Sequence, residues 1–503
     1  MMYLRRLFTI AILLCLLALA RPAGAYSLLT HEQLIDLTWQ SSIVPLLLSR
    51  YPTLTPEQIE HARAYAYGGC VIQDIGYYPY GDVFFSNLTH YVRSGDFIIN
   101  LFRNAGNADE LAFAIGALSH YIGDNVGHSE ATNLSVPIEF PKLGDKYGKV
   151  VNYAQGKRQH VQTEFAFDID EIAHHRFAPV HYLRHVGLQV PTKQLSLAFY
   201  QTYGLREDFT ITRHQRFNIR AYRFAVHGFI PRVAYAVTIL HRRHEPIDID
   251  NADLQKLTRE ITTVAQQNNW AAYREHVGIG TYTLAGLIYI IPKIGPLKLV
   301  AVKGPTPQTE MEYVHSVVKS TDELKRALRR FTPPPATIPS AALAAAADTN
   351  SDPSPSSAPL PTKRHGSMVI PSESKDPKHP LPNRDLDTGV PVRPSGYPLT
   401  DSTYASLLHR LTEIPTAPVP PGIKSDILAY YTNLDLPFGT KKDSAKWATV
   451  QQDLVTMRSM PTSNAALPYP TYGDGDDAGP DTGTGTTPAP DSAASPTAPQ
   501  LLP

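Results

Sequence analysis

Three metal-binding side chains recur at four-residue steps in the middle of this chain. His120, Asp124 and His128 stand in the stretch Ala-Leu-Ser-His-Tyr-Ile-Gly-Asp-Asn-Val-Gly-His. On a helix this spacing places all three on one stripe. The two histidines would lie about 12 Å apart along the axis, too far for one zinc ion with ligand bonds of about 2.0–2.2 Å. If Asp124 bridges two ions, with His120 on one side and His128 on the other, the stretch predicts at least two metals.

Further candidate ligands stand on both sides of this stretch, namely His31, Asp74, His90 and the pair His160 and Glu164. The last two are one helical step apart, which brings two ligands to one ion. Each candidate alone has an ordinary alternative, because a single histidine is commonly a polar residue with ordinary hydrogen-bond partners, and an amphipathic helix can turn a histidine-bearing face to solvent. Their order and spacing together favour a metal cluster.

The chain begins with the features of an export signal. Arg5 and Arg6 precede an apolar run over residues 7–20, and the small residues Ala-Gly-Ala end at Ala25. This pattern is typical of a cleaved signal peptide, and the run is short for a membrane span. We therefore expect residues 1–25 to be removed, leaving a secreted or periplasmic protein that starts at Tyr26 and has no transmembrane span.

Charge and cysteine content limit the remaining classes. The 46 basic and 46 acidic side chains balance, which removes any global electrostatic argument for a nucleic-acid partner. After cleavage Cys70 is the one remaining cysteine, so no internal disulfide can staple the mature chain. Bound metal could supply that constraint instead. The oligomeric state is not specified by these features.

Residues 26–330 have the apolar periodicity of helices and little strand-like alternation. Thr55 before Pro56 and Asn107 before an acidic turn are typical helix starts. We expect an all-α fold, a multi-helix bundle around a zinc cluster. The clearest predicted helices cover residues 32–49, 56–68, 108–121, 151–175 and 219–244.

Composition changes after Arg330. Residues 331–396 are rich in Pro, Ser, Ala and Thr, which predicts a disordered linker. Helical spacing returns over residues 397–460 and predicts a small helical segment, and residues 461–503 are expected to be a disordered tail. Since the candidate ligands end at Glu164, we expect a chain cut after Arg330 to keep its activity on a soluble substrate.

Together these residues resemble the zinc-dependent phospholipase C family, part of a superfamily that also contains single-strand-specific nucleases. The resemblance covers roughly residues 26–170, with Tyr26 where the family typically has tryptophan. It implies one zinc held by Asp74, His90, His120 and Asp124, a second held by His128, His160 and Glu164, and a third held by His31, Asp124 and the amine and carbonyl of Tyr26.

Such a cluster of two to three zinc ions predicts phosphodiester hydrolysis by a metal-activated water. Asp74 is the candidate catalytic residue, as ligand, as general base, or as both. The resemblance favours a phospholipase C acting on phospholipid head groups at a membrane surface. A nuclease or other phosphoesterase on the same metals is the alternative, with nucleic acid less expected because the exported nucleases usually carry disulfides. A non-catalytic, metal-stabilised binding module is the third hypothesis.

Five aromatic residues crowd the segment between Asp74 and His90 and bear on the substrate. Aromatic rings there could enclose a cationic head group or stack on a nucleobase, or they could simply pack the loop against the bundle. The residues are Tyr77, Tyr78, Tyr80, Phe84 and Phe85.

Overall fold

The computed structural model confirms the all-α fold. It describes residues 28–207, 209, 212–240, 251–274, 283–286, 288, 304–331 and 381–463. Within these ranges there is no β-strand, and the only bridges are two isolated pairs, Arg384 with Pro391 and Val419 with Thr462. The signal peptide and Tyr26, the expected linker up to residue 380 and the tail beyond residue 463 lie outside the described residues.

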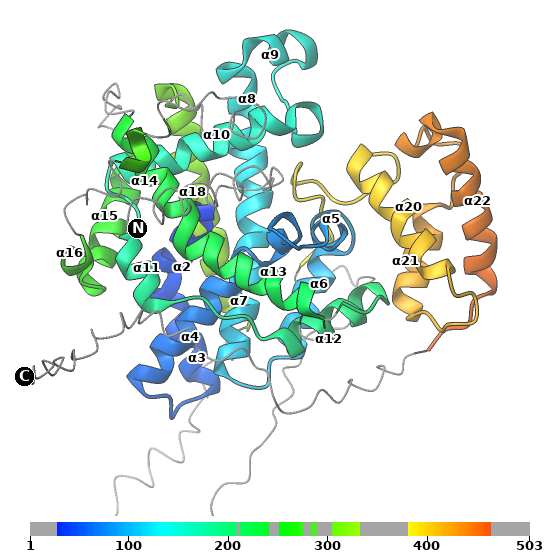
Figure 1. Ribbon diagram of the computed structural model, residues 1–503, viewed down its shortest axis with the longest axis horizontal. Coiled ribbons are helices and arrows are strands. Elements are labelled where there is room, and N and C mark those ends of the chain that lie inside the picture. The colour runs from blue at the N-terminus through cyan, green and yellow to red at the C-terminus, as the bar shows by residue number, and fades with distance from the viewer. Residues whose placement is uncertain are drawn as a thin grey trace, which may run out of the picture.

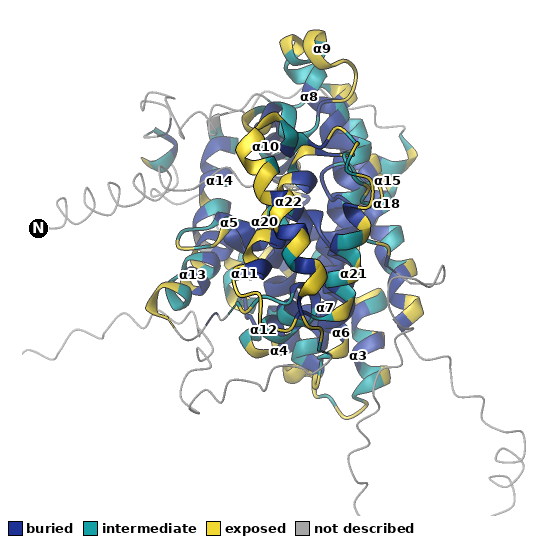
Figure 2. Ribbon diagram, turned by 90° about the vertical axis from the view of Figure 1, so that its right-hand side faces the viewer, coloured by how far each residue is buried: buried dark blue, intermediate teal, exposed yellow. Residues whose placement is uncertain are grey.

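The bundle is built around one long helix, α7 (Ala108–Gly127), which is buried along almost its whole length (Figure 2). Helices α4 (Pro56–Gly69), α6 (Ser94–Arg103) and α18 (Pro307–Phe331) pack against α7. The N-terminal helix α2 (Leu28–Thr38) is buried at all its positions and also contacts α7. The side chains of α7 are thus fixed by neighbours on several sides.

Both helix starts that the sequence predicts, at Thr55 and at Asn107, are N-caps in the structure. Thr55 caps α4 through a capping box with Gln58, and the Asn107 side chain accepts a hydrogen bond from the Glu110 backbone N–H at the start of α7. These caps satisfy backbone N–H groups that the first helical turn leaves without partners.

Two of the predicted helices are interrupted by π-helical turns just before a proline. The expected helix 32–49 is α2, the π-turn η1 (Trp39–Ile43) and α3 (Val44–Arg50), with Pro45 two residues past the turn. The expected helix 219–244 likewise contains the π-turn η4 (Ala225–Phe229) shortly before Pro231. A proline ring clashes with the carbonyl of the preceding turn, and a widened turn relieves that clash.

The other helices complete the bundle and its loops (Figure 1). They are η2 (Ile72–Tyr77), α5 (Val83–Tyr91), η3 (His128–Thr132), α8 (Asn133–Glu139), α9 (Pro141–Tyr147), α10 (Tyr153–Ala173), α11 (Val180–Val186), α12 (Thr192–Tyr203), α13 (Arg213–Phe224), α14 (Ile230–Leu240), α15 (Ala252–Gln267) and α16 (Trp270–Tyr273). In the described part of the chain, no helix is both long and apolar enough to cross a membrane.

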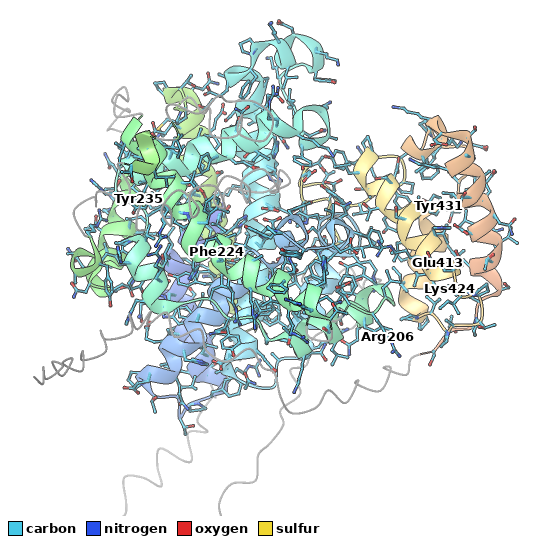
Figure 3. All side chains as sticks on the ribbon, in the orientation of Figure 1. Arg206, Phe224, Tyr235, Glu413, Lys424 and Tyr431 are labelled. Atoms are coloured by element: carbon cyan, nitrogen blue, oxygen red, sulfur yellow. The ribbon has the colours of Figure 1, made fainter. Side chains whose placement is uncertain are left out.

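The expected small helical segment forms a compact unit beside the bundle (Figure 1). It contains α20 (Pro398–Thr412), α21 (Pro421–Tyr430), the short turn η6 (Gly439–Lys442) and α22 (Ser444–Ser459). Tyr431 lies inside this unit, where its ring packs at 5.2 Å from that of Phe438 (Figure 3). Helix α20 contacts α5 of the bundle, so the unit and the bundle share an interface.

The structure corrects one end of the expected linker. Residues 381–396 are not disordered but run along the bundle, with Leu381, Leu386 and Asp387 buried. We call residues 381–397 the strap. The composition of this segment resembles a linker, yet its prolines lie beside Leu and Asp side chains that find partners on the bundle.

Candidate metal centre

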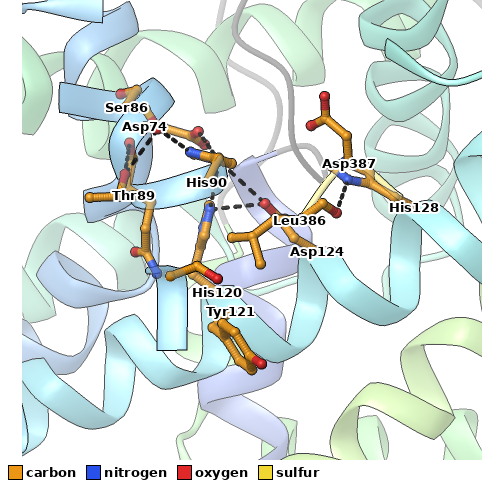
Figure 4. Close-up of polar contacts among 12 residues, drawn as sticks. Asp74, Ser86, Thr89, His90, His120, Tyr121, Asp124, His128, Leu386 and Asp387 are labelled. Carbon is orange, nitrogen blue, oxygen red and sulfur yellow. Dashed lines mark hydrogen bonds and ion pairs between the residues drawn. The ribbon is translucent and has the colours of Figure 1, made fainter. Parts of the chain in front are cut away.

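Asp124, near the end of α7, is the centre of the candidate site (Figure 4). Its Oδ2 lies 3.1 Å from His120 Nε2 and 3.4 Å from His90 Nε2. On the same side, His90 Nε2 lies 3.3 Å from Asp74 Oδ1. Helix α7 therefore supplies His120 and Asp124, α5 supplies His90 and η2 supplies Asp74, and the four side chains converge in the core.

The second carboxylate oxygen of Asp124 faces a different helix. Its Oδ1 lies 3.2 Å from Nε2 of His31 in α2, and the His31 ring stacks on that of His120 with 4.2 Å between centroids. Asp124 thus presents one oxygen to each of two histidine groups, as a bridging carboxylate must. Helix spacing alone predicted His128 beside this second oxygen. In the structure α7 ends at Gly127 and the π-turn η3 begins at His128, and His31 lies beside the oxygen instead.

His128 lies in a separate group with the two candidates from α10. Its Nε2 is 3.2 Å from Glu164 Oε1, and His160 Nε2 is 2.9 Å from the same oxygen. His160 and Glu164 are one helical step apart, as the sequence predicts, and all three side chains are buried.

Hydrogen bonds to backbone carbonyls orient three of the imidazoles. Nδ1 of His120 lies 3.0 Å from the Cys70 carbonyl oxygen, and Nδ1 of His90 lies 2.7 Å from that of Ser86. Nδ1 of His128 lies 2.8 Å from the carbonyl oxygen of Leu386. A carbonyl can only accept, so each Nδ1 carries a proton and each Nε2 faces the carboxylates, which is the orientation that metal-bound histidines usually have.

The electrostatics of the site fit a cation. Although burial alone would raise the pKa of the Asp124 carboxyl, His120, His31 and His90 hold it well below its usual range. Burial lowers the pKa of His160 to about 4, so its imidazole is neutral. Within the described chain neither oxygen of Asp124 accepts a hydrogen bond in good geometry. Nitrogen and oxygen atoms of these side chains thus converge at about 3 Å, and the buried carboxylates need positive charge beside them, which a bound metal ion could supply.

All predicted ligands in the described part of the chain are therefore brought together, while Tyr26 lies outside it. They form three groups, and within each group the ligand atoms lie within 4.8 Å of one another. The groups are His31, His120 and Asp124; Asp74, His90 and His120; and His128, His160 and Glu164.

A fourth group of this kind, not predicted from sequence, contains Asp170, His174 and Glu310. Here Arg176 already supplies the positive charge, with its Nη2 atom 3.3 Å from Asp170 Oδ2 and 3.2 Å from Glu310 Oε1. We interpret this group as a buried polar network around Arg176 that joins α10 to α18.

The aromatic residues between Asp74 and His90 divide between core and surface. Phe85 packs into the core against Phe199, with ring centroids 4.9 Å apart, whereas Tyr80 is 54% exposed. Tyr77 is buried with its ring 6.1 Å from that of His90. Packing of the loop therefore accounts for Phe85, whereas Tyr77 lies beside the candidate ligand His90.

Sequence reasoning did not find the groups that hold the ligands in place. Carbonyl oxygens of Ser86, Cys70 and Leu386 carry no side-chain signature, and Leu386 lies 258 residues from His128. The pair of aspartates Asp385 and Asp387 in the proline-rich strap is the one signal that could have drawn attention to this segment.

An all-α bundle with buried histidines and carboxylates gathered around one aspartate is typical of a class, the helical proteins that bind metal ions in their core. Comparison with known families narrows the class: the family model described as zinc-dependent phospholipase C matches residues 30–208. The match confirms the expected resemblance to that family over these residues. The match contains every predicted ligand except Tyr26. No curated protein and no solved structure matches the chain.

Proposed function

We propose that this protein is an exported phospholipase C that hydrolyses the head-group phosphodiester of phospholipids with two or three bound zinc ions. The family match supports a zinc-dependent hydrolase of phospholipase C type. The observation that carries the proposal further is the arrangement around Asp124, whose two oxygens face His31 on one side and His120 with His90 on the other.

The candidate ligands would have two kinds of role, metal binding and proton transfer. Zinc, when bound, supplies a water of lowered pKa and positive charge to balance a phosphoryl group under attack. Asp124 would be the bridge between two ions, and His128, His160 and Glu164 would hold another. Asp74 Oδ1 accepts no hydrogen bond within the described chain, which leaves it available as a ligand or to accept a proton from the attacking water.

Assays on three substrates test the reaction. The mature protein starting at Tyr26 is incubated with phosphatidylcholine vesicles, single-stranded DNA and a generic phosphodiester. We expect release of diacylglycerol and the phosphorylated head group from the vesicles, and loss of at least 100-fold in kcat/KM for Asp74→Asn, of the order found for acid–base residues. Cleavage of DNA without lipid hydrolysis would assign the nuclease alternative instead.

Elemental analysis tests the metal content. We expect two to three equivalents of zinc per chain, and chelation should lower both activity and thermal stability because the metal binds only the folded site. Less than one equivalent after refolding with excess zinc would contradict a cluster. Zinc without turnover on all three substrates would favour a metal-stabilised binding module.

A further inference from the structure

The strap touches every element that carries the ligands around His128. The Leu386 carbonyl accepts the Nδ1–H of His128, and the Leu386 backbone N–H donates to the His90 carbonyl at 3.1 Å. The Asn133 side chain, which follows the π-turn η3, donates to the Asp387 carbonyl at 2.7 Å. A short piece of strap backbone is therefore shared between α5, which carries His90, and η3, which carries His128 (Figure 4).

The Asp387 carboxylate fixes the strap in this position through hydrogen bonds from Tyr91 and Tyr397, and we call these three residues the Asp387 clamp. Its Oδ2 accepts hydrogen bonds from Tyr91 at 2.9 Å and from Tyr397 at 2.6 Å, and all three residues are buried. The Tyr397 hydroxyl in turn accepts from the Ala154 backbone N–H at the start of α10. Burial and the charge of Asp387 raise the pKa of Tyr397 well above its usual range, so its phenol remains a donor. The network thus reaches α10, which carries His160 and Glu164.

Close packing of the strap on α7 leaves little room for the strap to shift along that helix. Gly389 has φ +70°, and a Cβ there would lie 2.6 Å from the Asn125 carbonyl oxygen of α7. Tyr121 on the same helix donates its hydroxyl hydrogen to the Pro382 carbonyl at 2.5 Å. The strap is therefore docked on the last turns of the helix that carries Asp124 and leads into His128.

None of these strap residues belongs to the part that matches the family, which ends at residue 208. We propose that the strap is a built-in part of the metal centre: the Leu386 carbonyl is the positioning group of His128, and the Asp387 clamp holds it there. The inference rests on the proposed zinc centre and adds that zinc binding and docking of the C-terminal unit are coupled. By linkage, zinc must tighten the docked strap by the same factor that the docked strap tightens zinc.

The variants that test this come in matched pairs in the full mature chain. Asp387→Ala removes the clamp, and Tyr397→Phe removes one of its donors without changing the shape of the ring. The controls are Asp426→Ala and Tyr404→Phe, since the Tyr404 hydroxyl donates to Asp426 at 2.8 Å, a partly buried Tyr–Asp hydrogen bond of the same kind between α20 and α21 of the C-terminal unit.

Zinc affinity is measured by competition with a chromogenic chelator. We expect Asp387→Ala to weaken the loosest zinc 10–100-fold, as losses of groups behind metal-bound histidines usually do, and Tyr397→Phe to weaken it less. The two control variants should stay within about twofold of the parent, even where their melting temperatures fall. Affinities of the Asp387 and Asp426 variants that agree within twofold would overturn the inference.

Hydrogen exchange gives a second readout that does not depend on turnover. In the parent, amides of residues 381–390 should exchange more slowly with zinc than after chelation, and Asp387→Ala should remove that difference. Identical protection in both metal states of the parent would contradict the coupling. A parent that holds zinc but cleaves no phosphodiester would refute the proposed function alone, because neither readout measures hydrolysis.

Discussion

At the scale of single residues, Asp124 and His31 differ in how many groups they serve. Asp124 lies within 3.4 Å of three imidazole nitrogens, one of which is Nε2 of His31. We therefore expect Asp124→Asn to lose more zinc per chain than His31→Ala. Elemental analysis of the two purified variants checks this, and equal losses would argue against a bridging carboxylate.

Glu310 is the residue from which we expect a pH effect outside the metal centre. Burial and the neighbouring Asp170 carboxylate raise its pKa to about 8, against an ordinary value of 4.5 and despite the opposing charges of Arg176 and His174. Between these two pH values the folded chain binds more protons than the unfolded chain, so this group makes the free energy of unfolding fall as pH rises.

Glu310→Gln removes that titration. We expect the variant to lose less stability than the parent between pH 5 and 8.5 in urea unfolding, with Glu312→Gln on the same helix as the control. A parallel pH dependence for the parent and Glu310→Gln would show that Glu310 is already ionised in this range.

At the scale of elements, the contact between α4 and α7 has almost no spare room. A Cβ on Gly116 of α7 would lie 2.2 Å from the Ala66 carbonyl oxygen and 2.8 Å from the Cys70 backbone nitrogen of α4 and its C-cap. Cys70 is also the residue whose carbonyl accepts the His120 Nδ1–H. The glycine thus sets both the distance between the helices and the placement of a candidate ligand.

Gly116→Ala should therefore affect stability and metal binding together. We expect a loss of about 1–3 kcal/mol, the usual cost of overpacking a core, together with weaker zinc binding. Thermal unfolding and chelator competition measure the two effects. The control is Gly106→Ala, where the nearest atom is the flexible end of Glu110 at 3.3 Å. Unchanged zinc affinity in Gly116→Ala would mean that Cys70 does not position His120.

At the scale of the whole molecule, the structure changes what we expect of a truncated chain. The position of the ligands in the sequence predicts that a chain cut after Arg330 stays active. With the strap removed, His128 loses its hydrogen bond to the Leu386 carbonyl. The faces of α5 and α7 that the strap covers become exposed. A chain ending at Phe331 should therefore hold less zinc and turn over less substrate than the parent.

A second truncation, after Ser463, serves as the control because it keeps the strap and all described helices of the C-terminal unit. We expect it to match the parent in zinc content and kcat/KM on a short-chain soluble phospholipid. Full activity in the shorter chain ending at Phe331 would restore the expectation drawn from sequence.

The sequence by itself determined the helical fold and the types of the candidate ligands. Apolar periodicity and caps such as Thr55 act through neighbours a few residues away, so the start of α4 could be predicted. Pairs one helical turn apart, such as His160 and Glu164, could be predicted for the same reason.

Only the tertiary structure decided how these side chains are shared. Helix spacing gave Asp124 and His128 a common stripe, but packing of α2 against α7 brought His31 to the second oxygen instead. The role of the strap could not be predicted from sequence for a related reason. Its contact with His128 is made by the Leu386 backbone carbonyl, a group that every residue has. Which carbonyl meets which imidazole depends on chain segments far apart in sequence, and local patterns of residue type carry no record of it.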